Sequence, residues 1–413
     1  MDDVELPDVG VPVVRPMSGS TRPVRKVAIV IPDGLSATLF CTGMIRAVRA
    51  TPNHAITVIS DAGKSAGRIE QLGADSIQLK MHRYVSPLRD LVYIFRLARI
   101  LRSERFDAVI NFSTKPNTYG PIAAWLAGSR LVIGHVVGLG STFVPSEHDG
   151  FSGAALRFVV RGLYRAAAGL SDAMWFTNAS NLAYFQERGL VRHTETLLTR
   201  NYLDVNRYRA SAASAEEVSG LRAELGLAPD AGVVLMIARM IWAKGIREFV
   251  EAAVSLQQNE PSLHFILVAP PEDDGEGAVP ATYIEENVGK ANLQWLGFRD
   301  DIETLIGLCD VAVLPSFYRE GGYPRAILEP MAMGKPVVAA DTEDCRGPVE
   351  DGVTGYLVPP RDSVALAATI RKLMRDPELR RDLGTEARRK IDDEFDEDVI
   401  VPRALRQLGI IPA

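Results

Sequence analysis

Short apolar runs alternate with amphipathic stretches along most of the chain, and this alternation restricts the possible folds more than any other feature. Strand-like runs occur first at residues 27–31, 55–60, 108–111, 131–133 and 173–177, with helical patterns between them. After a polar interval at 205–232, the alternation resumes with runs at 233–237, 264–268, 293–296, 311–314 and 336–339. Apolar strands separated by helices are typical of parallel sheets covered on both faces. The sequence therefore predicts an α/β protein of two doubly wound, Rossmann-like domains.

Changes in composition suggest where these domains begin and end. Residues 1–23 contain four prolines and no apolar signal-peptide core, so we expect a disordered tail there. The first domain is expected at 24–205 and the second at 206–390, with a C-terminal segment at 391–413 that packs back on the first domain. A ligand site is expected between two such domains, at the carboxyl ends of the strands.

Several classes of protein are disfavoured by what the sequence lacks. No apolar run approaches the length of a transmembrane helix. The three cysteines, Cys41, Cys309 and Cys345, are too few and too scattered for a disulfide framework or a zinc motif, and they indicate a reducing cytoplasm. Neither half contains the G-x-G-x-x-G fingerprint of a dinucleotide site. We expect no metal or other cofactor and no nucleic-acid partner.

The net charge of −6 conceals an asymmetry between the two halves. Residues 24–205 contain 21 Lys/Arg against 13 Asp/Glu, whereas residues 206–413 contain 23 against 35. A basic half favours contact with an anionic membrane surface, although uneven charge also serves simply to keep domains soluble. Apolar residues and arginines are interspersed in the predicted helix at 88–105, which we expect to pack on its own sheet with its basic face toward lipid.

The stretch from Ser316 to Asp341 carries the clearest functional signal. Glu320 and Glu329 flank a Gly-Gly-Tyr-Pro turn that opens a predicted helix. The start of a helix presents backbone N–H groups and a partial positive charge, which suits a phosphate group. Glu329, about one turn inside the helix, is placed to accept hydrogen bonds from sugar hydroxyls. The alternative is a solvated helix carboxylate paired with Arg325, one turn earlier.

Two cations follow the first strand of the second half. Arg239 and Lys244 are five residues apart in the loop after the strand at 233–237. Together they can hold a diphosphate and stabilise the negative charge that grows on it as it leaves. Taken alone, the two residues are more often solvated loop cations, but the predicted helix start at 324–327 in the same half favours the diphosphate interpretation.

Five further residues are weaker candidates. Phe298 and Arg299 follow a predicted strand, where the simplest roles are a strand end and a helix cap. Lys115, Asn117 and His135 are weak candidates for the acceptor site. Lys115 near a strand end is a candidate for an acceptor phosphate, and Asn117 is also a candidate for the cap of the next helix. His135 lies just past another strand, where a structural role is more common for a lone histidine than contact with the substrate.

These motifs resemble the retaining glycosyltransferases of family 4, which have the two-domain GT-B fold. The segment at 316–341 is similar to the E-x7-E signature of this family, with one additional residue between its glutamates, and Arg239 and Lys244 match its Arg…Lys-Gly motif. The segments at 83–90, 111–120 and 138–143 resemble the subgroup that extends lipid-diphosphate-linked glycans, including N-acetylgalactosaminyltransferases of bacterial N-glycan assembly. The resemblance spans roughly residues 25–390.

The resemblance implies a role for each motif. Arg239 and Lys244 would grip the donor diphosphate, Glu329 would bind the ribose, and Glu320 would meet the transferred sugar if the two adjacent glycines absorb the extra residue. The remaining donor-site candidates lie at or near the helix start, or in the loop at 298–299: Gly322, Arg325, Ile327, Leu328, Phe298 and Arg299.

The expected protein is a cytoplasmic glycosyltransferase, peripheral on the inner face of the cell membrane. It would move a sugar from a nucleoside diphosphate to a glycan on a polyprenyl diphosphate carrier, with retention of configuration by front-face substitution. Two alternatives stay open: a nucleotide-sugar 2-epimerase of the same architecture, and a catalytically silent scaffold that binds the donor.

Overall fold

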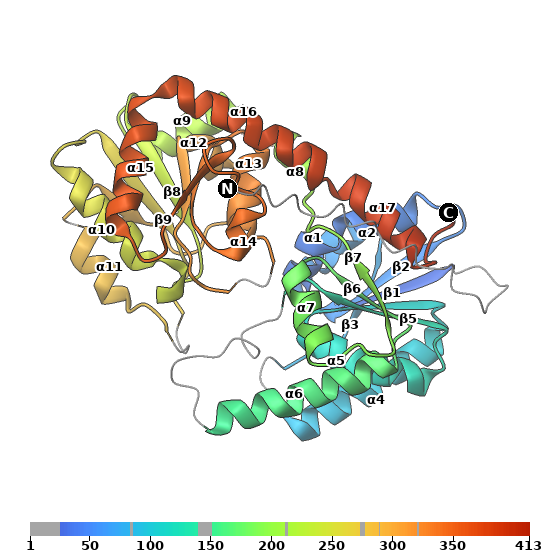
Figure 1. Cartoon of the computed structure of the whole chain (residues 1–413). Coiled ribbons are helices and arrows are strands. Elements are labelled where there is room, and N and C mark those ends of the chain that lie inside the picture. The colour runs from blue at the N-terminus through green and yellow to red at the C-terminus, as the bar shows by residue number, and fades with distance from the viewer. Residues whose placement is uncertain are drawn as a thin grey trace, which may run out of the picture. The chain divides into compact units, whose positions relative to one another are not determined.

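The chain forms two compact units, each built on its own parallel sheet. The computed structural model describes residues 25–82, 86–138, 151–210, 214–272, 277–288, 290–319 and 322–413, so the expected tail at 1–23 lies outside the described residues. Unit 1 runs to Tyr202 and takes in Glu397–Ala413, and unit 2 comprises Leu203–Asp396 (Figure 1). Two doubly wound α/β units confirm the fold class predicted from the sequence.

Unit 1 contains a seven-stranded sheet in the order β3-β2-β1-β4-β5-β6-β7, with every neighbouring pair parallel. Its strands are β1 (Lys26–Asp33), β2 (Ala55–Asp61), β3 (Asp75–Gln78), β4 (Ala108–Phe112), β5 (Leu131–Val136), β6 (Ala173–Phe176) and β7 (Glu195–Leu198). Along β1, Val27 and Ile29 belong to the apolar cluster on one face of the sheet, whereas Ala28 and Val30 belong to the cluster on the other. Because successive side chains of a strand point to opposite faces, this continuous apolar run buries both.

Helices cover both faces of the unit 1 sheet. They are α1 (Gly34–Phe40), α2 (Thr42–Arg49), η1 (Gly63–Ser65), α3 (Ala66–Gln71), α4 (Pro87–Glu104), α5 (Thr114–Ala127), α6 (Phe151–Gly169), α7 (Ala179–Glu187) and α17 (Glu397–Gln407). Helices α1, α2, α3 and α17 pack on one face, and α4 and α5 pack on the other. Helices α6 and α7 bury the remaining part of β5 and β6.

Unit 2 contains a six-stranded parallel sheet in the order β10-β9-β8-β11-β12-β13. Its strands are β8 (Gly232–Ile237), β9 (Leu263–Val268), β10 (Leu293–Trp295), β11 (Val311–Leu314), β12 (Val337–Ala340) and β13 (Gly355–Val358). Its helices are α8 (Val205–Ala210), α9 (Ala215–Glu224), η3 (Trp242–Lys244), α10 (Ile246–Gln257), α11 (Ala281–Val288), α12 (Ile302–Leu308), α13 (Arg325–Ala332), α14 (Glu343–Arg346), α15 (Ser363–Arg375) and α16 (Pro377–Glu394). Two apolar clusters, one on each face of the sheet, form its core.

The C-terminal helix α17 completes the core of unit 1. Val401, Leu405 and Leu408 are buried in the same cluster as the apolar face of α2. At the start of α17, the buried Glu397 accepts a 2.7 Å hydrogen bond from Arg46 Nη2 of α2. A Cβ atom at Gly43 would lie 2.9 Å from Glu397 Cδ, so the glycine allows this close approach.

The order of strands fixes where ligands meet each sheet. In both units the chain moves outward from a central strand in one direction and then, at β4 or β11, turns to the other side. The carboxyl ends of the two strands at such a switch point diverge, and ligands of doubly wound folds bind there. The switch point lies between β1 and β4 in unit 1 and between β8 and β11 in unit 2.

Within the described part of the chain, no helix has both the length and the hydropathy that crossing a bilayer requires.

Candidate functional site

Two loops meet at the switch point of unit 2. One follows β8 and contains η3, and the other follows β11 at residues 315–318. The backbone N–H groups of Phe317 and Tyr318 both donate to the carbonyl of Ala243, each over 2.9 Å. Gly245 has a φ of +80°, and a Cβ atom there would overlap the carbonyl of Pro315. A glycine is therefore required for the loops to approach so closely.

This contact between the loops places both predicted catalytic cations, Arg239 and Lys244, near the ring of Tyr318. The guanidinium carbon of Arg239 lies 5.1 Å from the centroid of the Tyr318 ring, and Lys244 Nζ lies 5.3 Å from the same centroid. Lys244 is buried, with 8% of its surface exposed. The Arg239 side chain is about half exposed, and its Nη1 atom lies 3.8 Å from Glu272 Oε1. The two cations thus lie at the carboxyl end of β8, at the switch point of unit 2.

Glu329 is buried in helix α13 and has a charged partner. Arg325 Nε donates a 2.7 Å hydrogen bond to Glu329 Oε1, and Arg325 Nη2 donates to the Tyr208 hydroxyl over 3.1 Å. Burial, and then the neighbouring Glu329 carboxylate, raise the pKa of Tyr208 far above its ordinary value. Arg325, the partner considered from the sequence, is therefore paired with Glu329. The two side chains form a buried polar group with Tyr208 of α8.

The start of α13 differs in detail from the expected phosphate cradle. Pro324 occupies the N-cap position, and its carbonyl accepts the N–H groups of both Ile327 and Leu328. The side chains of Ile327 and Leu328 are fully buried in the core. A phosphate at this helix end would therefore meet backbone groups that precede these two residues. Gly322 is buried just ahead of the helix, and Glu320 lies outside the described residues.

The loop after β10 holds the other two donor-site candidates. Phe298 is 67% exposed. Arg299 is held by hydrogen bonds to both carboxylate oxygens of Asp301, at 2.7 and 2.6 Å, and by a 2.9 Å bond to Glu224 of α9. Arg299 thus links this loop to α9 through hydrogen bonds, whereas the ring of Phe298 is exposed to solvent.

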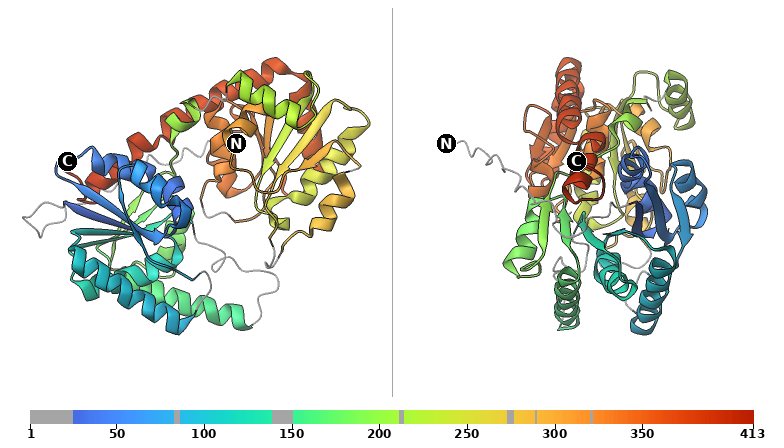
Figure 2. Two further views of the ribbon diagram at one scale, coloured as in Figure 1. Left: turned by 180° about the vertical axis from the view of Figure 1, so that it is seen from behind. Right: turned by 90° about the vertical axis from the view of Figure 1, so that its right-hand side faces the viewer.

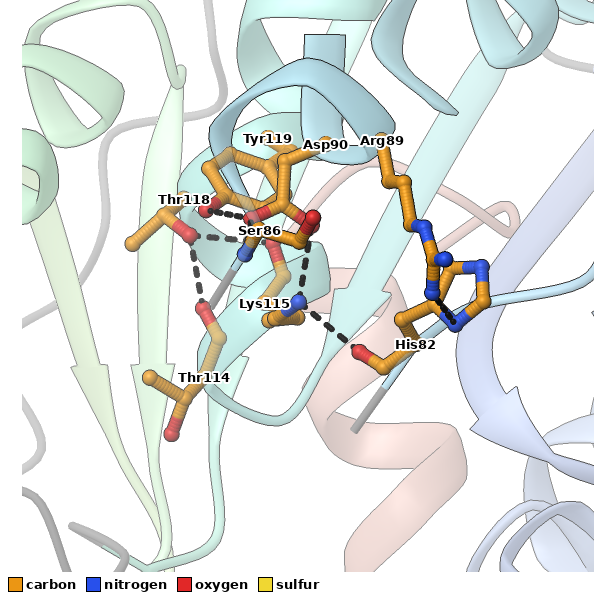
Figure 3. A network of polar contacts seen from close by, with 8 residues as sticks. All are labelled: His82, Ser86, Arg89, Asp90, Thr114, Lys115, Thr118 and Tyr119. Carbon is orange, nitrogen blue, oxygen red and sulfur yellow. Dashed lines mark hydrogen bonds and ion pairs between the residues drawn. The ribbon is translucent and has the colours of Figure 1, made fainter. Parts of the chain in front are cut away.

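In unit 1, Lys115 belongs to a polar network at the switch point (Figure 3). Its Nζ donates 2.8 Å hydrogen bonds to Asp90 Oδ1 and to the carbonyl of His82. Asp90 also accepts hydrogen bonds from the Ser86 N–H and the Tyr119 hydroxyl. Burial alone would raise the pKa of Asp90, but these donors outweigh it and hold the pKa below its ordinary value. Lys115 therefore joins the starts of α4 and α5 through an ion pair.

Asn117 and His135 form a second pair in unit 1. The Asn117 side chain donates to the His135 carbonyl over 2.8 Å and accepts from the His135 N–H over 3.0 Å. The cap expected at Asn117 is wrong, because α5 begins three residues earlier with Ser113 at its N-cap position. The His135 ring is fully buried between Phe112 and Trp175, and burial lowers its pKa to about 3. This position puts the neutral imidazole in the core.

A third feature of unit 1 is a layer of helices with an apolar, basic outer face. Helix α5 contacts both α4 and α6, and the three helices run along the lower edge of unit 1 in Figure 1 and in both views of Figure 2. We call their exposed large apolar residues the α4–α6 surface: Leu88, Leu91, Val92, Phe95, Trp125, Leu126, Phe158 and Val159. The three helices contain eight Lys/Arg and two Asp/Glu, one of which is the buried Asp90. In the described residues no element covers this surface.

Sequence reasoning missed three residues of these groups: Tyr318, Tyr208 and Asp90. Tyr318 lies inside the segment singled out for its glutamates, and its position in the loop that follows a buried strand was a usable signal. Tyr208 and Asp90 gave none, because their partners lie 117 and 25 residues away in the chain. The described residues contain no group of three or more His, Cys, Asp or Glu that is arranged to hold a metal ion.

Comparison with known protein families assigns both units. A model of the glycosyl transferases group 1 family matches residues 219–390, and a model of the glycosyl transferase 4-like domain matches residues 37–201. The chain is a glycosyltransferase. The first match contains Arg239, Lys244 and Glu329, whereas Tyr208 precedes it.

Individual relatives support the same family. The chain is 28% identical, over 90% of its length and 95% of the relative's, to the N,N'-diacetylbacillosaminyl-diphospho-undecaprenol alpha-1,3-N-acetylgalactosaminyltransferase of Campylobacter jejuni. It is 26% identical, over 67% of its length and 68% of the relative's, to the UDP-Gal:alpha-D-GlcNAc-diphosphoundecaprenol alpha-1,3-galactosyltransferase of Escherichia coli.

A solved structure shows the fold. The crystal structure of Anabaena HepE in complex with UDP and glucose is similar with a TM-score of 0.71 and 22% identity, covering 93% of this chain and 99% of that one. This glycosyltransferase thus has the GT-B fold that the sequence predicted.

Proposed function

We propose that this glycosyltransferase transfers a sugar from a nucleoside-diphosphate donor to a glycan carried on polyprenyl diphosphate. The observation that carries the donor half is the convergence of Arg239 and Lys244 around Tyr318 at the carboxyl end of β8. The acceptor half is supported by the Campylobacter and Escherichia relatives, whose names state lipid-diphosphate-linked acceptors.

In the proposed donor complex, the diphosphate lies against Arg239 and Lys244. Glu329 accepts hydrogen bonds from the ribose hydroxyls, and Glu320 contacts the transferred sugar. Retention of configuration follows from a front-face substitution. The bond from the anomeric carbon to the phosphate oxygen breaks as a new bond to the acceptor oxygen forms on the same face. The acceptor proton passes to the leaving phosphate oxygen. Arg239 and Lys244 stabilise the charge that develops on the diphosphate.

The proposed acceptor lies at a membrane, and the α4–α6 surface is the part of unit 1 that we assign to it. Eight exposed apolar side chains next to an excess of arginine fit the boundary between lipid head groups and acyl chains. Arginines of α4, such as Arg96 and Arg99, are exposed beside Phe95 and would meet anionic head groups. We therefore propose a peripheral enzyme on the cytoplasmic face of the cell membrane, where nucleotide sugars are made.

The two alternative functions predict different products. The family matches to both units support sugar transfer over the nucleotide-sugar 2-epimerase, which would change the donor without needing an acceptor. A silent scaffold would bind the donor without turnover.

One experiment separates the three functions. Purified protein is incubated with a panel of nucleoside-diphosphate sugars and with polyprenyl-diphosphate-linked glycans, and all products are identified by mass spectrometry. Transfer requires a mass increase of one sugar on the lipid-linked acceptor and release of the nucleoside diphosphate. An epimerised donor with no acceptor product, or donor binding with no product at all, would contradict the proposal.

A further inference from the structure

The ring of Tyr318 lies within reach of both donor-site cations, and nothing in the family motif assigns it a role. We propose that Tyr318 is a positioning residue, which holds Arg239 and Lys244 together at the diphosphate site before the donor binds. This inference rests on the proposed function, because it concerns the same two cations.

Two like charges on flexible side chains do not converge without help. Arg239 and Lys244 repel each other, and each side chain loses rotamer freedom when it is fixed. The face of an aromatic ring attracts cations within about 6 Å of its centroid. The measured distances of 5.1 and 5.3 Å place both cations inside that range. One ring can therefore offset the repulsion and restrict both side chains.

The ring itself is held by backbone contacts. The carbonyl of Ala243 accepts the N–H groups of Phe317 and Tyr318, and the Ser316 hydroxyl donates to the same carbonyl over 3.4 Å. This carbonyl belongs to η3, directly before Lys244 in the chain. The backbone that positions the ring is thus joined to the backbone that positions one of its cations. A donor that reaches this site meets cations already in place, so little of its binding energy is used to order them.

The neighbouring residue provides a matched control. Phe317 lies in the same segment and has a cation over its ring, because the guanidinium carbon of Arg361 is 4.4 Å from its centroid. Phe317→Leu removes a ring of the same kind from the same loop without touching Arg239 or Lys244. Tyr318→Phe keeps the ring and removes only the hydroxyl, whereas Tyr318→Leu removes the ring.

The experiment is calorimetric titration of each variant with UDP, GDP and ADP, followed by titration with the nucleoside of whichever diphosphate binds the wild-type protein most tightly. We expect Tyr318→Leu to weaken binding of that nucleoside diphosphate about 5–30-fold, which corresponds to two cation–π contacts. Binding of the nucleoside should not change, because it has no diphosphate. Tyr318→Phe and Phe317→Leu should bind both ligands within about twofold of the wild-type protein.

A second measurement separates positioning from damage to the fold. In a protein that already carries Arg239→Ala and Lys244→Met, adding Tyr318→Leu should weaken binding no further, because the ring acts only through these cations. A further loss in that background, or an equal loss of nucleoside binding, would overturn the inference. So would a Tyr318→Leu variant that binds like the wild-type protein, or a Tyr318→Phe variant as weak as Tyr318→Leu.

The same data show which proposal has failed. If Arg239→Ala and Lys244→Met weaken binding of the diphosphate but Tyr318→Leu does not, the donor site stands and the role of Tyr318 is wrong. If none of the three changes affects binding, the proposed donor site itself is wrong.

Discussion

Arg325 and Glu329 form a buried ion pair one turn apart in α13, with 2.7 Å between Arg325 Nε and Glu329 Oε1. Both side chains are largely covered, and the Tyr208 hydroxyl contacts the pair from α8. Removal of either partner would leave the other charge buried and uncompensated, which typically costs about 3–5 kcal/mol. The pair therefore links the proposed ribose ligand to the stability of unit 2.

The first prediction concerns Glu329. Glu329→Ala should weaken nucleoside diphosphate binding about tenfold or more, because ribose hydroxyls lose their acceptor. It should also lower the free energy of unfolding by about 3 kcal/mol, because Arg325 loses its partner. Glu329→Gln keeps an acceptor oxygen, so its losses of nucleoside diphosphate affinity and of unfolding free energy should both be smaller. Calorimetric titration and chemical denaturation measure the two effects. As a control, Glu386→Ala removes an exposed partner of Arg389 in α16 and should leave the free energy of unfolding almost unchanged. Wild-type binding by a folded Glu329→Ala variant would remove this residue from the site.

The second prediction concerns Glu320, whose proposed partner is the sugar. Glu320→Ala should leave nucleoside diphosphate affinity unchanged and reduce transfer, because the free nucleotide lacks the sugar. Titration with the nucleotide and a transfer assay are made on the same preparation. Normal transfer by the variant would mean that the extra residue before α13 has displaced Glu320 from the site.

The third prediction concerns the diphosphate cations. Arg239→Ala and Lys244→Met should each reduce kcat about 10²–10³-fold, the usual effect of removing one donor that stabilises developing charge. Methionine is chosen at the buried Lys244 because it roughly keeps the side-chain volume, so the thermal midpoint should move little. Full activity in either folded variant would contradict the assignment.

The sequence predicted the central strands well and missed three strands that are sheet edges. Strands β3, β7 and β13 each occupy one end of a sheet. An edge strand has one neighbour and needs no continuous apolar run, and the sequence of β3, Asp-Ser-Ile-Gln, has none. The pattern also did not show helix boundaries, since the chain after β1 forms two helices, α1 and α2, that are divided at Cys41.

For the candidate site, the spacing of four residues predicted Arg325 as the partner of Glu329. It did not predict the contacts with Tyr318 and Tyr208, which come from other elements. A motif records which residue types recur, whereas the partner of a side chain depends on which elements pack together. Phe298 and Lys115 illustrate this limit, because one proves exposed and the other is held by an aspartate of a different helix. The ligand roles of both residues stay predictions.

The fourth prediction tests the Lys115–Asp90 pair through pH. The lowered pKa of Asp90 means that its ionised form stabilises the fold at pH above the ordinary carboxyl range, and that this contribution is lost as the pH falls through the folded-state pKa. Lys115→Met should destabilise unit 1 by about 3 kcal/mol at pH 7, because Asp90 is then buried without its cation. The difference from the wild-type protein should narrow at pH 4, where a buried carboxyl without its cation is protonated. Chemical denaturation of both proteins at pH 7 and pH 4 measures this difference in unfolding free energy. A difference that is the same at both pH values would contradict the pairing of Lys115 with Asp90.

The fifth prediction tests the α4–α6 surface. The double variant Leu91→Ser/Phe95→Ser should lose most of its binding to vesicles that contain phosphatidylglycerol, and binding of the wild-type protein should weaken as salt is raised. Both residues are at least half exposed, so the fold should be unaffected. Val399→Ser on α17, which removes an apolar residue of similar exposure elsewhere on unit 1, is the control. Equal vesicle binding by the double variant and the control would exclude this surface.

Helix α17 affects how the protein is made. The core of unit 1 includes Val401 and Leu405, yet the whole of unit 2, Leu203–Asp396, is synthesised between the seventh strand of unit 1 and this helix. At a synthesis rate of about 5–20 residues per second, unit 1 waits roughly 10–40 s on the ribosome for α17. During that time the apolar face of α2 lacks its cover. We expect nascent unit 1 to depend on chaperones, and its folding to finish only after α17 has left the ribosome.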